Sequence, residues 1–293
     1  MMENRDGAKR NLELVQKNLK ADCGNCFALC CAGLCFTASA DFAFDKAAGV
    51  PCPNLQSDFR CGIHEDLRRS GFKGCTVFDC YGSGQKVSQV TFKGKDWRKD
   101  PGAAKEMFAV FPVMTQLHEM LWYLADAMKQ ETAKQIYNEL EEMMQKTERL
   151  TLLEVPELMA LDIPIHRAQV NDLLVKASEL ARADVLKRNK GRKSKKLTQR
   201  NADMMGAELK GADLKGVDFR GAYFIAANLR QADLRTADLI GADFRDADIS
   251  GADLSTSLFL TQVQANAAIG DCHTKLPEAI SRPDHWAKKP RIF

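Results

Sequence analysis

Nine of the ten cysteines lie between Cys23 and Cys80. Four of them follow the spacing C-x2-C-x3-CC, and others follow at longer intervals. Two thiolates in a CxxC turn can point to one metal ion, and later cysteines can complete its tetrahedral shell. The predicted metal ligands are the eight cysteines of these clusters: Cys23, Cys26, Cys30, Cys31, Cys52, Cys61, Cys75 and Cys80.

The spacing leaves the metal and the number of ions open. Eight thiolates exceed one tetrahedral site, so the candidates are two zinc or iron ions, a cluster of several ions, or an iron–sulfur centre. Buried free thiols are the alternative. Cys35 matches no motif position and is expected to be a small buried residue. His64 is expected at the surface or at the start of a helix, outside the site.

The segments DCGNCFALCC and PCPNLQSDFRCGIHEDL, followed by a further cysteine, resemble the CxxCxxxCC family of zinc- or iron-chelating domains over residues 20–82. The family has Arg-Pro before its next cysteine, and here Arg68-Arg69-Ser70 stands in that place. The resemblance implies that the eight cysteines chelate metal. Because the signature also occurs in proteins linked to protein methylation, an iron–sulfur or metal–thiolate enzyme using the cysteine cluster stays an alternative.

Other catalytic fingerprints are missing from the sequence. It contains no G-x-S-x-G, P-loop or G-x-G-x-x-G motif. A thiol nucleophile needs a nearby base, and spacing alone does not bring His64, His118 or His166 to a cysteine. We therefore predict no catalytic residue and favour a non-enzymatic protein.

Helices are expected to follow the cysteines. Lys86–Pro101 combines a short β-prone piece with charges and glycine, which indicates a linker. Residues 103–149 carry apolar side chains at helical spacing, which predicts a helix that Pro112 kinks or interrupts and a second helix from about Glu131. Residues 165–187 show the same pattern. These segments suit a helical hairpin or bundle, with the methionines, the aromatics, His118 and His166 in packing or capping roles.

A basic run follows this helical part. Residues 187–200, KRNKGRKSKKLTQR, contain eight Lys or Arg and no acid. Such a run is typical of a solvated connector. It has no aromatic side chain that could stack on a base, so nonspecific nucleic-acid binding is disfavoured.

Residues 202–256 repeat every five positions. An apolar residue occupies the centre of eleven consecutive pentads, from Met204 to Leu254, and Ala or Val lies two positions before it. A period of five fits neither a helix nor a strand, so the chain must turn within each unit and form a coil stacked on itself.

Units such as Gly-Ala-Asp-Leu-Lys and Gly-Ala-Asp-Phe-Arg resemble the pentapeptide-repeat family. The resemblance implies a right-handed quadrilateral β-helix with four pentads per coil over residues 202–271. The following tail is also similar to the C-terminal tails of multi-part bacterial pentapeptide-repeat proteins, and it could cap the last coil. Gln264 takes a central position where a large apolar residue is expected.

The charge and length of the repeat bear on its partner. Ten acids and six bases give residues 202–256 a net charge of −4. Some members of the family protect topoisomerases by resembling duplex DNA in shape and charge. Eleven pentads, at about 4.8 Å per coil, would stack to only roughly 13 Å, against about 34 Å for one turn of DNA. A DNA topoisomerase partner is therefore disfavoured, and an antibiotic-resistance role is kept only as family analogy.

Together these patterns predict a multi-domain α+β protein: a Cys-rich metal-binding module and linker (1–100), a helical hairpin or bundle (101–190), a basic linker (191–201), a β-helix (202–271) and a C-terminal cap (272–293). We expect a cytoplasmic scaffold that binds an unidentified protein partner, because the net charge is only +3 and neither a signal peptide nor a membrane span is evident. The oligomeric state and the metal stay undetermined at this level.

Overall fold

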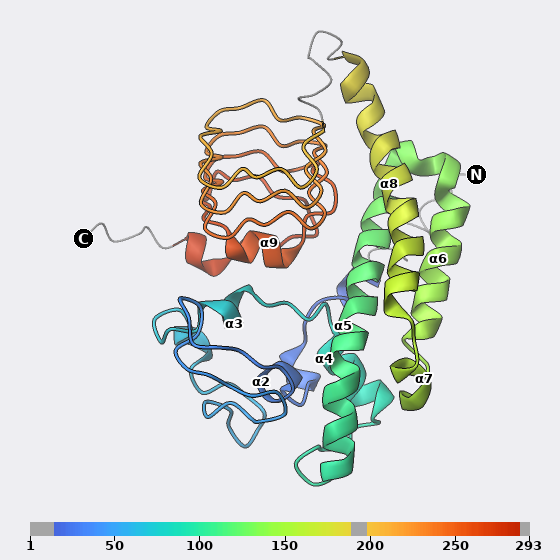
Figure 1. Cartoon of the computed structure of the whole chain (residues 1–293), viewed down its shortest axis with the longest axis vertical. Coiled ribbons are helices and arrows are strands. Elements are labelled where there is room, and N and C mark those ends of the chain that lie inside the picture. Colours follow the sequence, from blue (N-terminus) through green and yellow to red (C-terminus); the bar gives the residue numbers. More distant parts are fainter. Residues whose placement is uncertain (1–14, 189–197, 288–293) are drawn as a thin grey trace. The chain divides into compact units, whose positions relative to one another are not determined.

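A computed structural model describes residues 15–188 and 198–287. The chain divides into two compact units, Met1–Lys129 with Ile136–Leu174 and Gln130–Gln135 with Val175–Phe293 (Figure 1). Most of the basic run 187–200 lies outside the described residues. Within the described ranges, none of the helices has an apolar stretch sufficient to cross a bilayer.

Helices of very different lengths build the first unit. They are α2 (Leu29–Ala32), α3 (Lys73–Val77), α4 (Ser83–Gln85), α5 (Pro101–Lys129), α6 (Tyr137–Leu150), α7 (Val155–Met159) and the first part of α8 (Ile163–Arg188). Shorter turns are η1 (Cys23–Asn25), η2 (His64–Asp66) and the π-helical turn η3 (Lys86–Thr91), while η4 (Glu131–Ile136) lies between α5 and α6.

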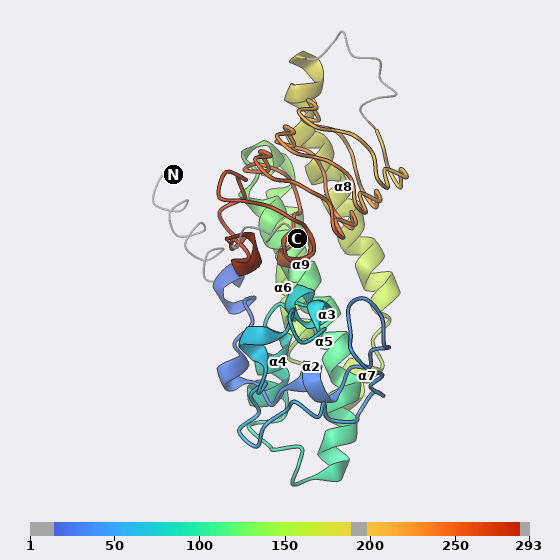
Figure 2. The same ribbon diagram turned by 90° about the vertical axis from the view of Figure 1, so that its left-hand side faces the viewer.

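Helix α5 organises the first unit. The Asp100 carboxylate accepts the Ala103 N–H at 3.0 Å and caps its start. Helix α5 packs against α2, α4, α6 and α7, and it lies beside α6 in both views (Figures 1 and 2). The helix continues through Pro112, so the predicted interruption does not occur. Proline removes one main-chain hydrogen bond, and the buried Phe111 and Met114 hold this stretch in the core.

The segment expected to be a linker is packed instead. Its first part forms η3, which contacts α4 and α5. The packing against these helices outweighs the preference of its valines and threonine for a β-strand. Trp97 is buried, and its indole N–H donates to the Phe27 carbonyl at 2.7 Å. The Arg98 guanidinium donates to the carbonyls of Gln56 and Ser57. Residues 86–101 thus tie the cysteine loops to α5.

The second unit is a stack of coils. Parallel bridges join residues twenty positions apart at four places per coil, as in Asp213 to Asp233 and Asp233 to Asp253. The pairing forms isolated bridges and no long strands, because each pentad turns a corner. It begins at Thr198 and continues to Lys275, so it extends beyond both expected boundaries of the repeat. Figure 1 shows the stacked coils and α9 (Gln262–Ala267) at their end.

Large apolar side chains fill the middle of the stack. Phe224 packs against Phe219 and Phe244, with ring centroids 4.9 and 5.1 Å apart. Alanines such as Ala222 and Ala227 are also fully buried. Small and large residues therefore alternate along the coil as the pattern predicted.

The C-terminal part closes the stack. The Gln264 side chain on α9 donates to the carbonyls of Leu239 and Ala242 at 2.7 and 2.9 Å, and it accepts the Thr261 N–H at 2.8 Å. Because these bonds need an amide, they explain why the polar Gln264 occupies a position where the repeat predicts an apolar residue. The Trp286 indole N–H donates to the Ala268 carbonyl at 3.0 Å and holds the tail against the same end.

Another part of the second unit covers one row of the coils. Arg182, on α8, donates to the Gly216 carbonyl at 2.9 Å and lies 3.5 Å from the Asp218 carboxylate. In the next coil, Arg220 pairs with Asp238 at 2.8 Å. Both carboxylates are buried, so two of the acids in the repeat are structural.

Candidate metal centre and repeat surface

A tight turn presents the first two cysteines. The Asp22 carboxylate accepts the Gly24 N–H at 2.9 Å and the Asn25 side-chain amide at 2.7 Å, which fixes η1 with Cys23 at its start. Cys26 follows directly. Ala28 then takes a left-handed conformation, with φ 55°, and begins α2, which carries Cys30 and Cys31.

Backbone amides point at three of the sulfurs. The Leu29 and Ala28 N–H groups and the Ser88 hydroxyl donate to Cys26, the Ile63 N–H donates to Cys61, and the Gly84 and Gly82 N–H groups donate to Cys80. Burial raises the pKa of all three thiols, and each of these bonds opposes that rise by stabilising the thiolate. Thiolates are the form that binds metals, so these donors favour the form of the thiol that a metal ion would need.

Two of these loops contain left-handed residues that are not glycine. Ala28 follows Cys26 by two positions, and Tyr81, with φ 50°, follows Cys80 directly. A left-handed conformation costs an L-residue about 1–2 kcal/mol. The Tyr81 loop is held from α5, because His118 Nδ1 lies 2.7 Å from the Tyr81 carbonyl oxygen and the Ser83 hydroxyl lies 2.7 Å from that of Thr115. Such strain is characteristic of functional loops.

Main-chain bonds connect the later cysteines to α2. The Cys52 N–H donates to the Cys31 carbonyl at 3.0 Å, and the Leu55 N–H donates to the Cys52 carbonyl at 3.0 Å. Leu55 and Cys61 form an antiparallel bridge. Cys75 lies within α3.

The thiols also affect one another. Cys30 and Cys31 have sulfurs 3.9 Å apart, and their hydrogen bond lowers the pKa of Cys31 to about 7 and raises that of Cys30. Burial raises the pKa of Cys75 to about 12 and that of Cys80 to about 11. A bound cation would supply the positive charge that deprotonates these thiols, with release of protons.

Lys46 places a buried positive charge beside the cysteines. Its ammonium donates to the carbonyls of Ala32, Ala47 and Val50. Burial lowers the pKa of Lys46, while Cys52 and Cys31 raise it, as do Cys35 and Cys30 more weakly. The charge can compensate nearby thiolates.

All eight predicted ligands lie in the first unit. Six are half-buried, and Cys23 and Cys75 are exposed. In the described ranges 15–188 and 198–287, no three Cys, His, Asp or Glu side chains lie close enough together to hold a metal ion as placed. Cys35 is exposed, so the prediction that it is a small buried residue was wrong, because the packing around a lone thiol is not encoded in local spacing.

Three residues of the module were missed by sequence reasoning. Lys46 and Ser88 approach the cysteines from distant parts of the chain, and no motif marks them. Gly84 lies in α4, where a Cβ would be 2.7 Å from Cys26 Sγ and 3.7 Å from Cys80 Sγ. Only the fold could reveal these contacts.

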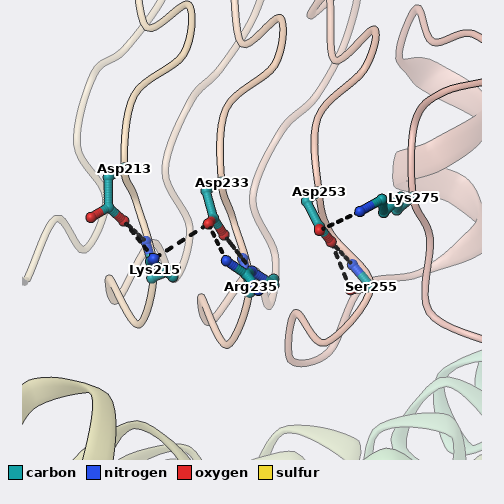
Figure 3. Close-up of polar contacts among 7 residues, drawn as sticks. All are labelled: Asp213, Lys215, Asp233, Arg235, Asp253, Ser255 and Lys275. Atoms are coloured by element: carbon teal, nitrogen blue, oxygen red, sulfur yellow. Dashed lines mark hydrogen bonds and ion pairs between the residues drawn. The ribbon is translucent and has the colours of Figure 1, made fainter. Parts of the chain in front are cut away.

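Residues twenty positions apart form a row along one side of the β-helix, and in one such row acidic and basic side chains pair with one another (Figure 3). Lys215 lies 3.9 Å from Asp213 and 3.5 Å from Asp233, and Arg235 lies 2.6 Å from Asp233. Asp253 pairs with Lys275 at 3.2 Å. Three acids thus face three bases, and the row has no net charge. The row that bridges Asp203, Tyr223 and Asp243 is different, because Tyr223 and the adjoining Met205 are 47% and 57% exposed.

Comparison with known proteins agrees with the stacked coils. The family of pentapeptide repeats matches residues 200–221 and 218–255, in eight copies. The chain is 58% identical over 272 residues to the uncharacterized protein YybG of Bacillus subtilis (strain 168), and the match covers 93% of this chain and 96% of that protein. The chain belongs to the same family as YybG. It is a pentapeptide-repeat protein with a β-helix in its C-terminal part.

A solved structure is also similar to this pentapeptide-repeat protein. It is the crystal structure of a pentapeptide repeat protein from the thylakoid lumen of Arabidopsis thaliana. The two are 27% identical, the match covers 28% of this chain and 57% of the Arabidopsis chain, and the TM-score is 0.16. A TM-score this low supports no conclusion, and the stacked coils rest on the bridges described above.

Proposed function

We propose that this protein is a non-enzymatic scaffold in which the N-terminal cysteine module holds a structural metal and the β-helix contacts a protein partner. The metal is zinc or iron, with an iron–sulfur centre among the forms that iron takes with thiolates. The proposed ligands are the eight clustered cysteines.

The amide–sulfur hydrogen bonds carry the metal part of this proposal. Buried free thiols have no need of N–H donors, since a neutral thiol is only a weak acceptor. Here five backbone amides donate to Cys26, Cys61 and Cys80. Two of the loops that supply them contain the left-handed residues Ala28 and Tyr81. The donor chemistry therefore fits thiolates, and because burial raises the pKa of these three thiols, a bound metal ion would supply the positive charge that deprotonates them.

Two exposed apolar side chains, Met205 and Tyr223, support a protein partner. Met205 and Tyr223 expose large apolar side chains on a regular, rigid coil. Aromatic side chains and methionine are enriched at protein interfaces. The opposite row, with Asp233 and Arg235, is neutralised by its own ion pairs. That row cannot supply the uncompensated negative charge that a DNA mimic needs, so topoisomerase protection and antibiotic resistance are not part of this proposal.

Metal analysis of the full chain, purified without oxygen and without added metal, tests the metal part. We expect at least one zinc or iron ion per chain, and less than about 0.3 ion per chain would refute it. A visible spectrum separates the forms, because brown protein that bleaches on reduction would favour the iron–sulfur alternative.

Photo-crosslinking tests the scaffold part. A photoreactive residue in place of Tyr223 should give one discrete protein adduct in the cells that produce the protein. The same residue in place of Arg235, half a coil away, is the matched control and should give none. Equal adducts from both positions would refute this face as the partner surface.

A further inference from the structure

We propose that the open end of the β-helix, formed by the first coil (residues 198–217), binds an extended segment of another protein that adds one further rung to the stack. The first coil lies at the end of the stack opposite α9 (Figure 1). The inference rests on the proposed scaffold function and deepens it, because it places the protein partner and states the chemistry of the segment that binds.

The apolar core is uncovered at this end. Met204 and Leu209 hold central positions of the first coil, and both are only half-buried. Their equivalents one coil later, Phe224 and Leu229, are 0% exposed. Near the end that α9 closes, Leu254 is also fully buried. The first coil therefore offers apolar side chains that the last coil does not.

Main-chain groups also point out of the open end. Tyr223 donates its N–H to the Ala202 carbonyl and accepts the Met204 N–H, both at 2.9 Å, so its N–H and C=O both face the preceding coil. Asp203 holds the same place one coil earlier, and Glu208 repeats the arrangement on the next side of the coil. Within the described part of the chain, the N–H and C=O of these two acids have no hydrogen-bond partner. Edges of this kind accept an added strand.

The repeat pattern supplies no apolar rung before the first coil. Counting back in fives from Met204, the central positions would be Gln199, Ser194 and Asn189, all of which are polar. The one large apolar residue between positions 189 and 200 is Leu197, which lies outside this register. The apolar side chains that cover the end must therefore come from another molecule.

The size of the end disfavours a second copy of this chain. If each side of the coil has about three extended residues, it spans about 10 Å, and the end with its outward side chains covers roughly 400 Å². A stable interface buries about 800 Å² on each partner. Two copies meeting end to end would fall short of this area, whereas a segment that continues along the side with Met205 and Tyr223 can bury more.

The charge of the rim points the same way. Asp203 and Glu208 pair with no base among residues 15–188 and 198–287, whereas Asp243, in the same row as Asp203, pairs with Arg245 at 2.7 Å. With Lys210, the two acids give these two sides of the first coil a net charge of −1. Two copies would bring like charges together, which disfavours their contact. A basic side chain on the partner would instead complement the rim.

These features define the segment that fits. Its main chain would pair with the N–H and C=O groups of Asp203 and Glu208. Because side chains alternate along an extended chain, an apolar residue over Met204 or Leu209 would be followed by one at the rim. A lysine or arginine at the rim position would face the two carboxylates. Main-chain pairing would supply affinity, and the alternate side chains would supply specificity.

Peptide display on the immobilised full chain tests this inference. From random peptides, the wild type should enrich sequences that alternate apolar and polar residues and contain an excess of Lys and Arg. A synthetic copy of the enriched peptide should bind Leu209→Asp at least about 10-fold more weakly than the wild type. Leu152→Asp is the matched control, because Leu152 is an exposed leucine of the first unit, and it should bind like the wild type.

Hydrogen exchange of the complex identifies the mode of binding. The bound peptide should slow exchange of the Asp203 and Glu208 amides at least about 10-fold and leave the Asp243 amide unchanged. Because Leu209→Asp can fail to fold, Glu208→Lys provides a second variant at an exposed position. It should reduce the excess of basic residues among the enriched peptides.

Several outcomes would overturn the inference. They are the absence of any enriched peptide, equal binding by Leu209→Asp, unchanged exchange at Asp203 and Glu208, and an unaltered basic excess with Glu208→Lys. A wild type that sediments as a dimer, with Leu209→Asp as a monomer, would assign the end to a second copy and would also overturn it. The proposed function is judged separately, since discrete crosslinks from position 223 would leave it in place when the end binds no peptide.

Discussion

Replacing Gln264 by leucine restores the apolar residue that the repeat pattern predicts, and we nevertheless expect it to destabilise the β-helix. The native amide satisfies the Ala242 carbonyl and the Thr261 N–H at the closed end of the stack. A leucine side chain can form neither hydrogen bond. The Leu239 carbonyl also loses its bond from Gln264, but it still accepts the Ala242 N–H at 3.0 Å.

The magnitude follows from these contacts. Each buried polar group left without a partner costs about 1–3 kcal/mol, and two groups lose theirs. Burying a leucine side chain returns about 2 kcal/mol. The Gln264→Leu variant should therefore lose about 2 kcal/mol of the free energy of unfolding of the second unit.

Native-state hydrogen exchange in increasing urea, followed by mass spectrometry of β-helix peptides, measures this loss. The peptides report on the second unit alone. Gln262→Leu is the matched control on the same helix α9. The Gln262 side chain is half-buried, and its bonds to the Ser281 main chain are exposed, so water can replace them and we expect a change below about 1 kcal/mol. A Gln264→Leu variant as stable as the wild type would show that the amide bonds do not close the stack.

Three further predictions follow from buried groups. Phe224→Ala should cost about 3–5 kcal/mol in the same exchange experiment, because the ring is fully buried between Phe219 and Phe244; a cost below about 1 kcal/mol would contradict the packed core. Gly84→Ala should weaken metal affinity at least about 10-fold in chelator competition, since the added methyl group would displace the Cys26 sulfur. Gly102→Ala is its control, and equal affinities would argue against Gly84 lying at the site. Burial lowers the pKa of His118 from 6.5 to about 4, so the stability it contributes is complete above pH 6.5 and is lost as the pH falls towards 4. Relative to His118→Gln, the wild type should lose about 3 kcal/mol between pH 7 and about pH 4 in urea unfolding, and parallel pH profiles would refute this role.

The repeat could be predicted from the sequence because its period is local. Every pentad from Met204 to Leu254 carries the same small and large residues, and the coil follows directly from them. The exceptions depend on distant contacts. Gln264 is polar because α9 places it against two carbonyls of the preceding coil, and Pro112 is accepted in α5 because its neighbours are buried.

The cysteine module was predictable only in part. Spacing predicts eight cysteines as metal ligands, which stays a prediction, and it gave no sign that Cys35 is exposed. The amide donors depend on the backbone conformation at Ala28 and Tyr81, and Lys46 and Ser88 approach from other segments. Such features arise from tertiary packing, which overrides what local spacing can indicate.

X-ray absorption of the metal-loaded full chain tests the central claim most directly, because it measures the atoms bound to the metal. We expect a first shell made only of sulfur, with about four sulfur atoms per metal ion at about 2.3 Å. A shell of nitrogen and oxygen at about 2.0–2.2 Å would contradict it, because the metal would then be held by groups other than the clustered cysteines.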